Sequence, residues 1–422
     1  MEPSVVTLVF ASALLLSLAT KLWLGTRQMR HVAFNRHAVP TAFAGTVTLA
    51  AHQRAAGYTL AKCRFGLWTT AIGSAVLLGW TLLGGLDAVN TLLRATVMPA
   101  WGGLAYQLTL VAVVTLIGGM IELPLEWYAT FRLEQRFGFN RMTLKLWIAD
   151  QFKGAAIGAL IGLPLAALVL WLMGASGGLW WLWAWAALVA FNLLLMVIYP
   201  TVIAPLFNKF QPLADESLKA RVQALMQRCG FAAKGLFVMD GSRRSAHANA
   251  YFTGLGAAKR VVFFDTLLQR LSPVEVEAVL AHELGHFKHK HVLQRLLGVF
   301  AISLAGLALL GWLAGQSGFY AGLGVRPNMS APNDALALLL FMMVVPSFGF
   351  FVSPLMAYFS RRHEFEADAY ACVQADGRAL ANALLKLHED NAATLTPDPL
   401  YARFYYSHPP AGERLAALPA PA

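Results

Sequence analysis

The sequence has little charge and little cysteine. Charged residues make up only 13% of its 422 residues, whereas hydrophobic residues make up 58%, a balance outside the range of soluble globular proteins. The three cysteines, Cys63, Cys229 and Cys372, are far apart and form no C-x-x-C pair. Neither a disulfide framework nor a thiolate zinc site is therefore predicted. The composition indicates a membrane protein.

The excess of positive charge is not gathered on one polar domain. The formal net charge is +11, but the basic residues are dispersed through loops between apolar stretches. Such loops are typical of membrane topology rather than of nucleic-acid binding. We therefore expect a lipid bilayer as a partner and no nucleic acid.

Seven stretches are long and apolar enough to cross a bilayer, which takes roughly 20 residues each. They lie near Val5–Leu24, Phe65–Leu86, Trp101–Leu125, Gly154–Gly174, Leu179–Pro200, Leu293–Gly315 and Ala335–Phe359. The first stretch lacks the basic residues that precede the apolar part of a signal peptide, so it is interpreted as an uncleaved span.

The loops between these spans alternate in charge. The first loop carries Arg27, Arg30, Arg36, Arg54, Lys62 and Arg64 without any acidic residue, and the third loop is also basic. The second, fourth and sixth loops carry almost no charge. Because positive loops stay in the cytosol, we expect the N-terminus outside and the C-terminus inside.

A metal-binding pattern lies between the fifth and sixth spans, in His282-Glu283-Leu284-Gly285-His286. On a helix, residues four apart share one face, so both imidazoles can bind a single ion with Glu283 beside them. This His-Glu-x-x-His pattern is typical of zinc hydrolases. The alternative is that both histidines are ordinary polar positions on an amphipathic helix, because short motifs also recur by accident.

The helix that the motif needs has its own start signal. Ser272 can act as N-cap, Pro273 fits the first helical position, and Glu275 completes a capping box. No helix breaker follows before the first histidine. Beyond the motif, His289 and His291 are expected to be surface or interfacial residues.

A third ligand is expected downstream, since zinc in a catalytic site takes three protein ligands and leaves one position open. Glu364 and Asp368 are four residues apart, which permits one ligand and one carboxylate that orients a metal-binding histidine. The alternative is a salt-bridged surface with Arg361 and Arg362. Glu366 lies about 200° round the helix from Glu364 and is expected to be a solvated charge.

The segment between the fifth span and the motif has mixed α and β character. Leu218–Cys229 has helical spacing and ends at a glycine, and the sequence GLFVMD before Gly241 predicts a short strand. Asn249–Thr253 and Arg260–Phe264 are β-rich and flank a turn, which predicts a hairpin. A further helix is expected at Gly377–Asn391.

Several other segments accompany the metal motif in the order that one family shows. They are Glu122 to Pro124, Phe137 to Arg141, Phe207 to Phe210, Asn249 to Gly254, Phe264 to Leu267, Glu364 to Tyr370 and Tyr406 to Pro410. With these segments the chain resembles the type I CAAX prenyl proteases, which are zinc endopeptidases of membranes. Several motifs in order are far more specific than any one of them.

Together, the spans and the resemblance imply a mainly α fold. We expect a polytopic membrane protein with seven transmembrane helices and a cytosolic, gluzincin-like zinc protease domain that contains a small β-hairpin or sheet. Spans one to five occupy residues 1–200, and the metalloprotease segment occupies 201–292. Spans six and seven occupy 293–359, and the third-ligand helix and tail occupy 360–422.

The resemblance also implies roles at the metal centre. His282, His286 and Glu364 would bind one Zn²⁺ per chain, and Glu283 would be the catalytic base. Asp368 would support a ligand from behind, because it matches the acidic residue that follows the third ligand in the family.

Further roles come from the same resemblance. His408 would lie near the metal and stabilise the oxyanion, and Arg414 would support the acidic residues. Asn249 and Ala250 would bind the substrate backbone on an edge strand. From spacing alone, these two residues could equally belong to an ordinary hairpin.

The implied activity is hydrolysis of a hydrophobic or prenylated peptide, with removal of the C-terminal tripeptide after a prenylated cysteine. A broader role in quality control of membrane proteins is the alternative. A zinc-stabilised transporter or an inactive scaffold would belong to another class, but a structural zinc site has no use for a glutamate between its two histidines.

The expected location is a bacterial inner membrane, or the endoplasmic reticulum membrane if the source is eukaryotic. The chain is rich in Ala, Leu, Gly and Arg. It ends in Ala420-Pro421-Ala422, without the lysine-rich tail of some eukaryotic members of the family. Both features favour the bacterial location.

Overall fold

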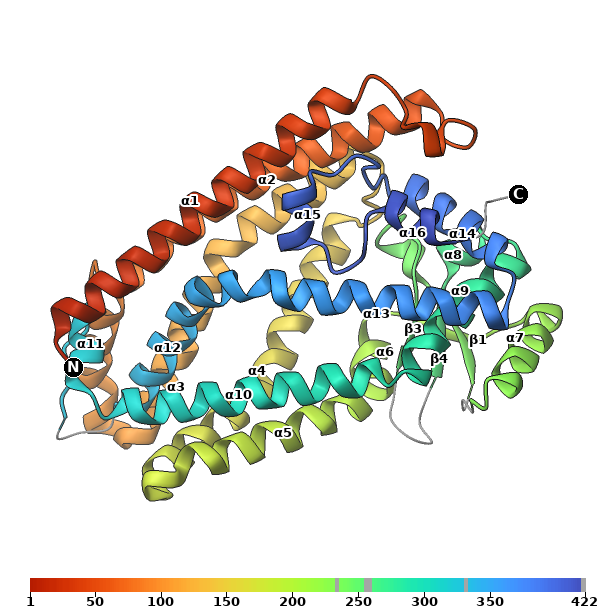
Figure 1. The fold of residues 1–422 in the computed structure, drawn as a ribbon. Helices are drawn as coiled ribbons and strands as arrows, with labels where there is room; N and C mark the ends of the chain where they lie inside the picture. Colours follow the sequence, from red (N-terminus) through yellow and green to blue (C-terminus); the bar gives the residue numbers. More distant parts are fainter. Residues whose placement is uncertain (232–234, 254–259, 330–332, 419–422) are drawn as a thin grey trace.

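Long helices dominate the computed structural model (Figure 1), which describes residues 1–231, 235–253, 260–329 and 333–418. The long helices are α1 (Pro3–Asn35), α2 (Leu49–Trp80), α3 (Gly85–Tyr128), α4 (Leu144–Ala175), α5 (Trp180–Ile198), α10 (His291–Ala314), α12 (Asp334–Gly349) and α13 (Ser353–Gln374). The shorter helices are α6 (Ala204–Phe207), α7 (Glu216–Arg228), α8 (Asp265–Leu268), α9 (Pro273–Lys288), α11 (Ser317–Gly322), α14 (Gly377–Asp390), α15 (Pro399–Tyr405) and α16 (Ala411–Ala417). The described residues also form short helical turns, which are η1 (Thr41–Phe43), η2 (Ala129–Glu134), η3 (Gly177–Leu179), η4 (Tyr199–Ile203), η5 (Gly241–Arg243) and η7 (Phe350–Val352).

Six helical stretches among the described residues are long and apolar enough to cross a membrane. They are α1, α3 with η2, α4, the region of α5, α10, and α12 with α13. Six of the seven predicted spans lie in these stretches. The other, Phe65–Leu86, lies on α2, whose part after Arg64 ends at Trp80 and is shorter than the roughly 20 residues a span needs. Seven is therefore an approximate count.

The outward faces of these helices are apolar. Phe152, Leu160 and Trp183 have exposed fractions of 74%, 75% and 59%. Exposing such side chains to water costs a free energy of about 25 cal/mol per Å² of apolar surface. The hydrocarbon of a bilayer removes this cost. Together with the six apolar stretches, these faces identify an integral membrane protein.

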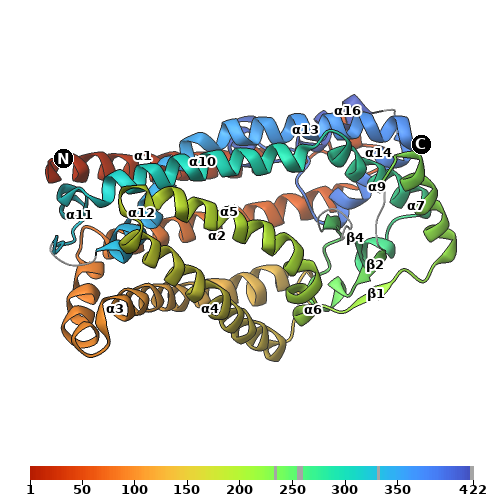
Figure 2. The same cartoon turned by 90° about the horizontal axis from the view of Figure 1, so that it is seen from below.

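The helices pack most closely at the end that holds the N-terminus. There α1, α3, α11 and α12 surround a core that includes Phe10, Tyr106, Leu110 and Tyr320. The four-stranded sheet and α16 lie at the opposite end (Figure 2). The long helices therefore connect two packed ends of the molecule.

The sheet has the strand order β1-β2-β4-β3. Its strands are β1 (Phe210–Pro212), β2 (Leu236–Met239), β3 (Ala250–Thr253) and β4 (Arg260–Phe264). The predicted hairpin is confirmed, because β3 and β4 pair antiparallel, whereas β2 and β4 pair parallel. β3 has a neighbour on one side, so it is an edge strand.

A second core joins this sheet to α7, α9 and α14, with Val222, Leu225, Phe263 and Leu280 at its centre. The predicted capping box of α9 is present: the Glu275 backbone N–H donates to Ser272 Oγ, and the Ser272 backbone N–H donates to Glu275 Oε2. Glu275 also pairs with Lys386 of α14 at 2.8 Å. The start of α9 is thus fixed on the sheet and on α14.

Candidate metal centre

The two helices that carry the metal motif and the expected third ligand, α9 and α13, cross at Gly285. A methyl group on Gly285 would lie 2.9 Å from Ala367 Cα and 3.0 Å from the Ala367 carbonyl oxygen. These are backbone atoms and cannot rotate away, so only glycine permits this approach. The approach brings Glu364 of α13 to the two histidines of α9.

Three side chains from the two helices meet at one point. His282 Nε2 and His286 Nε2 are 3.2 Å apart. Glu364 Oε2 lies 3.5 Å from His282 Nε2, and Glu364 Oε1 lies 3.4 Å from His286 Nε2. Ligands about 2.1 Å from a tetrahedral zinc would be separated by about 3.4 Å. The spacing of the three groups fits such an ion.

The hydrogen bonding of the three groups also fits a cation. His282 uses Nδ1 to contact Asp368 and His286 uses Nδ1 to contact His291, at 2.7 and 3.0 Å. In the neutral rings this leaves both Nε2 atoms with lone pairs that face each other. Glu364 Oε2 is buried without a hydrogen-bond partner. Arg414 Nη1 lies 3.5 Å from that oxygen, and the two facing lone pairs and the carboxylate together fit a cation placed between them.

A buried ion pair supports His282 from behind. Asp368, which is 2% exposed, accepts from Arg414 Nε at 2.8 Å in addition to its contact with His282. Arg414 lies on α16 and is 7% exposed. The carboxylate fixes the outer nitrogen of His282 as the donor, which leaves the inner nitrogen free to bind a metal.

A second supporting chain holds His286, and the sequence reasoning did not find it. His291 is 3% exposed, so its expected surface position is wrong. Its Nδ1 faces His286 Nδ1, and its Nε2 contacts Glu366 Oε2 at 3.0 Å. Glu366 also accepts from Arg362 at 2.9 Å, so it is not simply a solvated charge. The spacing of the motif alone holds no signal for these contacts.

Glu283 lies on α9 between the two histidines. Burial raises the pKa of its carboxyl above the usual range, and Glu364 adds to the rise, whereas His282 and His286 oppose it. A raised pKa brings a carboxylate closer to the pH at which a general base works best. The environment of Glu283 is therefore suited to proton transfer.

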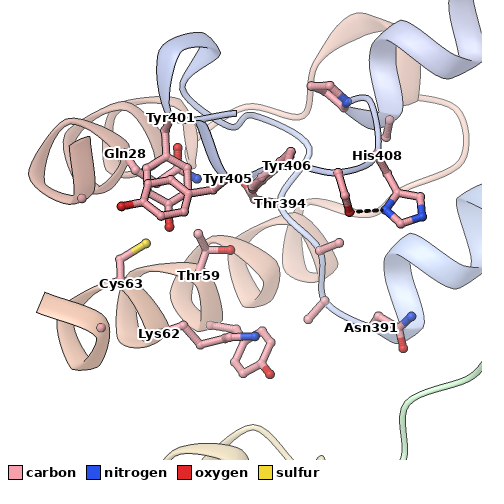
Figure 3. Close-up of a pocket in the computed structure, with 18 of the residues that line it drawn as sticks. Gln28, Thr59, Lys62, Cys63, Asn391, Thr394, Tyr401, Tyr405, Tyr406 and His408 are labelled. Atoms are coloured by element: carbon pink, nitrogen blue, oxygen red, sulfur yellow. Dashed lines mark hydrogen bonds between the residues drawn. The ribbon is translucent and has the colours of Figure 1, made fainter. Parts of the chain in front are cut away.

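The tail returns to the centre between α15 and α16. His408 Nε2 lies 3.5 Å from Glu364 Oε1, and its Nδ1 is 2.9 Å from Ser407 Oγ (Figure 3). The predicted placement of His408 near the metal centre is thus present in the structure, as is that of Arg414.

Asn249 and Ala250 lie at the start of edge strand β3. The Asn249 side chain accepts from the Ala250 backbone N–H at 2.8 Å, and the Asn249 carbonyl accepts from Phe264 of β4. Among the described residues, no hydrogen bond joins this pair to the three convergent side chains. The position of the pair is set by its hydrogen bonds at the edge of the sheet, and within the described part of the chain the pair forms no hydrogen bond with the three side chains of the centre.

The fold and the centre define a membrane-embedded zinc metalloendopeptidase. Residues 212–422 match the model of peptidase family M48, and residues 28–209 match the model described as CAAX prenyl protease N-terminal, five membrane helices. The chain belongs to peptidase family M48, whose members depend on zinc.

Curated relatives and a solved structure match nearly the whole chain. The CAAX prenyl protease 1 homolog of Arabidopsis thaliana is 32% identical over 94% of this chain and 93% of its own length. The CAAX prenyl protease 1 homolog of Homo sapiens is 30% identical over 97% of this chain and 95% of its own length. The crystal structure of S. mikatae Ste24p is 30% identical, covers 98% of both chains and has a TM-score of 0.91.

Proposed function

We propose that the protein removes the C-terminal tripeptide from membrane-borne substrates that carry a prenyl group on the preceding cysteine. The observation that carries the proposal is the convergence of His282, His286 and Glu364 on helices that run directly into membrane-crossing ones. A protease centre built this way suits a substrate held by lipid. The names of the relatives, CAAX prenyl protease 1, support the same substrate class.

The proposed chemistry is hydrolysis of a peptide bond with water as the nucleophile. Zinc held by His282, His286 and Glu364 would supply a Lewis acid that lowers the pKa of water towards about 7 and polarises the scissile carbonyl. Glu283 takes a proton from the water and then gives it to the nitrogen of the leaving amine. Asp368 and Arg414 keep His282 in the orientation that this arrangement needs.

Two further groups handle the substrate in this proposal. His408 reaches the centre from the tail and donates a hydrogen bond to the oxyanion that develops on the carbonyl. Asn249 and Ala250 bind the substrate backbone, which adds as a strand beside β3. The edge position of β3 supports this assignment, because among the described strands only β4 pairs with it.

We also propose the orientation and the division of the chain expected from the sequence. The proposed location is a bacterial inner membrane, or the endoplasmic reticulum membrane if the source is eukaryotic. The basic loops favour a cytosolic protease part, a cytosolic C-terminus and an outside N-terminus. The separation of the N-terminus from the sheet and α16 (Figure 1) is compatible with this orientation. Residues 201–292 and 360–422 together form the proposed protease part, between and after the spans.

The test compares a farnesylated CAAX peptide with its unprenylated counterpart, each incubated with detergent-solubilised wild type and Glu283→Gln. Zinc content is measured alongside. We expect wild type to cut the prenylated peptide preferentially, a chelator to abolish cutting, and Glu283→Gln to keep zinc but lose at least about 100-fold in kcat.

Other outcomes separate the alternatives. Equal cutting of both peptides would favour a broader quality-control protease. A wild type that binds zinc and cuts neither peptide would contradict the enzymatic proposal and favour a scaffold or transporter.

A further inference from the structure

A cavity of about 620 Å³ lies beside the metal centre, between α1, α2 and the C-terminal tail. His408, 3.5 Å from Glu364, forms part of its wall. Figure 3 shows Tyr405 and Tyr406 of the tail on one side and Lys62 of α2 on the other. The cavity therefore meets the metal centre at His408. Its size is that of a small-ligand site, about 300–1,000 Å³.

The charge of this cavity has one sign. Lys21 of α1 and Lys62 of α2 line it, and none of its lining residues is acidic. Among the described residues, neither lysine has a carboxylate within 4.0 Å; each ammonium instead lies 5.0 Å from the centre of an aromatic ring, Phe350 for Lys21 and Tyr58 for Lys62.

The acidic residue that Lys62 influences at longer range already has other partners. Glu134 accepts from the Tyr58 hydroxyl at 2.6 Å and lies 3.6 Å from His247 Nε2. Its charge is thus distributed over these contacts. The two ammonium groups leave the cavity with a positive field that the protein does not neutralise within it.

A buried amide joins α1 to the C-terminal tail at the wall of this cavity. Gln28 is fully buried and lines the wall formed by α1. Its Oε1 accepts from the Asp398 backbone N–H at 2.6 Å, whereas its Nε2 makes no hydrogen bond of normal geometry, although the Tyr406 hydroxyl lies near it. The amide therefore fixes the position of the tail against α1.

We propose that this cavity binds the free C-terminal carboxylate of the peptide substrate, with Lys21 and Lys62 as its cationic partners. The inference rests on the proposed function and adds to it how the end of the substrate is recognised. Three extended residues span at most about 10 Å, so the carboxylate of a tripeptide leaving group lies within reach of a cavity that begins at His408. The tyrosines would then line the path of the leaving side chains.

A phospholipid phosphate is another anion that the same two lysines could attract. The carboxylate is favoured because the cavity begins at His408 and is lined by a neutral polar and aromatic wall. The experiment must separate these two sources of negative charge.

The test uses two prenylated peptides that differ only at the end, one with a free carboxylate and one with a carboxamide. Wild type, Lys21→Met, Lys62→Met and the double variant are compared in detergent without added lipid. Lys145→Met is the matched control, because Lys145 is exposed on α4 and lies outside the cavity. Zinc content and cutting of the carboxamide peptide show that each variant is folded.

We expect the KM of wild type to be about tenfold lower for the carboxylate peptide than for the carboxamide peptide, because one charge-assisted hydrogen bond contributes binding free energy of that size. The double variant should have the same KM for both peptides. Its cutting of the carboxamide peptide should equal that of wild type. Lys62→Arg should keep the preference, as should Lys145→Met.

Two results would overturn the inference while leaving the protease assignment intact. One is a wild type that cuts both peptides equally well. The other is a double variant that keeps the preference and responds only to added anionic phospholipid, which would assign the lysines to a lipid phosphate. A wild type that cuts neither peptide would instead contradict the proposed function.

Discussion

At the scale of single residues, the two histidines of α9 are held by different partners. His282 has a carboxylate behind it, whereas His286 has another imidazole, His291. If His286 keeps Nε2 for the metal, its Nδ1–H donates to His291 Nδ1, so the proton of His291 must be on Nε2. That N–H then donates to Glu366. The chain fixes one tautomer for each ring.

We expect His291→Ala to weaken zinc binding about 10- to 100-fold, as the loss of a group that orients a metal ligand typically does. The measurement is zinc affinity by competition with a chromogenic chelator, together with the thermal stability of the metal-free protein. His289→Ala is the control, because His289 is exposed and contacts His291 only by ring stacking. Unchanged affinity in His291→Ala would mean that His286 is held without it.

The core of the centre could be predicted from sequence because its residues share helical spacing. Four-residue steps place His282 with His286 and Glu364 with Asp368. His291 could not be found in this way, since it starts a new helix after Lys290, whose left-handed backbone conformation (φ 58°) interrupts the helical repeat of α9. The histidine partner of Glu366 is thus on α10, outside any local repeat, whereas its other partner, Arg362, is four residues away on α13.

At the scale of elements, the contact between α9 and α13 depends on Gly285. We expect Gly285→Ala to push the helices apart, with a destabilisation of about 1–3 kcal/mol from overpacking and a loss of bound zinc. Thermal unfolding and metal content check this. Gly298→Ala on α10 is the matched control, because a methyl group there meets nothing within 4 Å.

A Gly285→Ala variant with wild-type stability and zinc content would contradict the idea that this close approach sets the distance between ligands. The sequence did not indicate this role, because the glycine occupies one of the two free positions of the motif. Its partner, Ala367, is on a helix far along the chain. Such pairs become visible only in three dimensions.

The elements with strong local signals were predicted well. The capping box of α9, the hairpin of β3 and β4, and the helix α7 (Glu216–Arg228, expected at Leu218–Cys229) each have a cap or turn pattern nearby. Strand β1 was not predicted, because its three residues contain a proline and are defined only by their pairing with β2.

At the scale of the whole molecule, the proposed orientation makes the two ends of the chain accessible from opposite sides. We expect an epitope tag before Met1 to be reached by antibody in intact cells, or by protease from the lumen of microsomes. A tag after Ala422 should be reached only from the cytosolic side. Tag accessibility before and after selective permeabilisation is the measurement, and a cytosolic marker protein is the control.

If both tags were reached from the same side, the number of crossings would be even. That result would contradict an odd number of spans and would bear directly on α2, the helix with the shortest apolar part. Composition could predict the membrane class and the approximate number of spans. It could not predict which helices pack together, because their surfaces are apolar along their length and carry no pattern that identifies a neighbour.

The ligands of the metal centre are carried by elements that continue into the bilayer. α13 belongs to the apolar stretch Asp334–Gln374, and only two residues separate the end of α9 from the start of α10. A mismatch between helix length and hydrocarbon thickness costs fractions of a kcal/mol per Å and is relieved by tilting. A change in tilt would alter separations of about 3.4 Å between ligand atoms. Acyl-chain length should therefore act on this hydrolase as a modulator of its affinity for zinc.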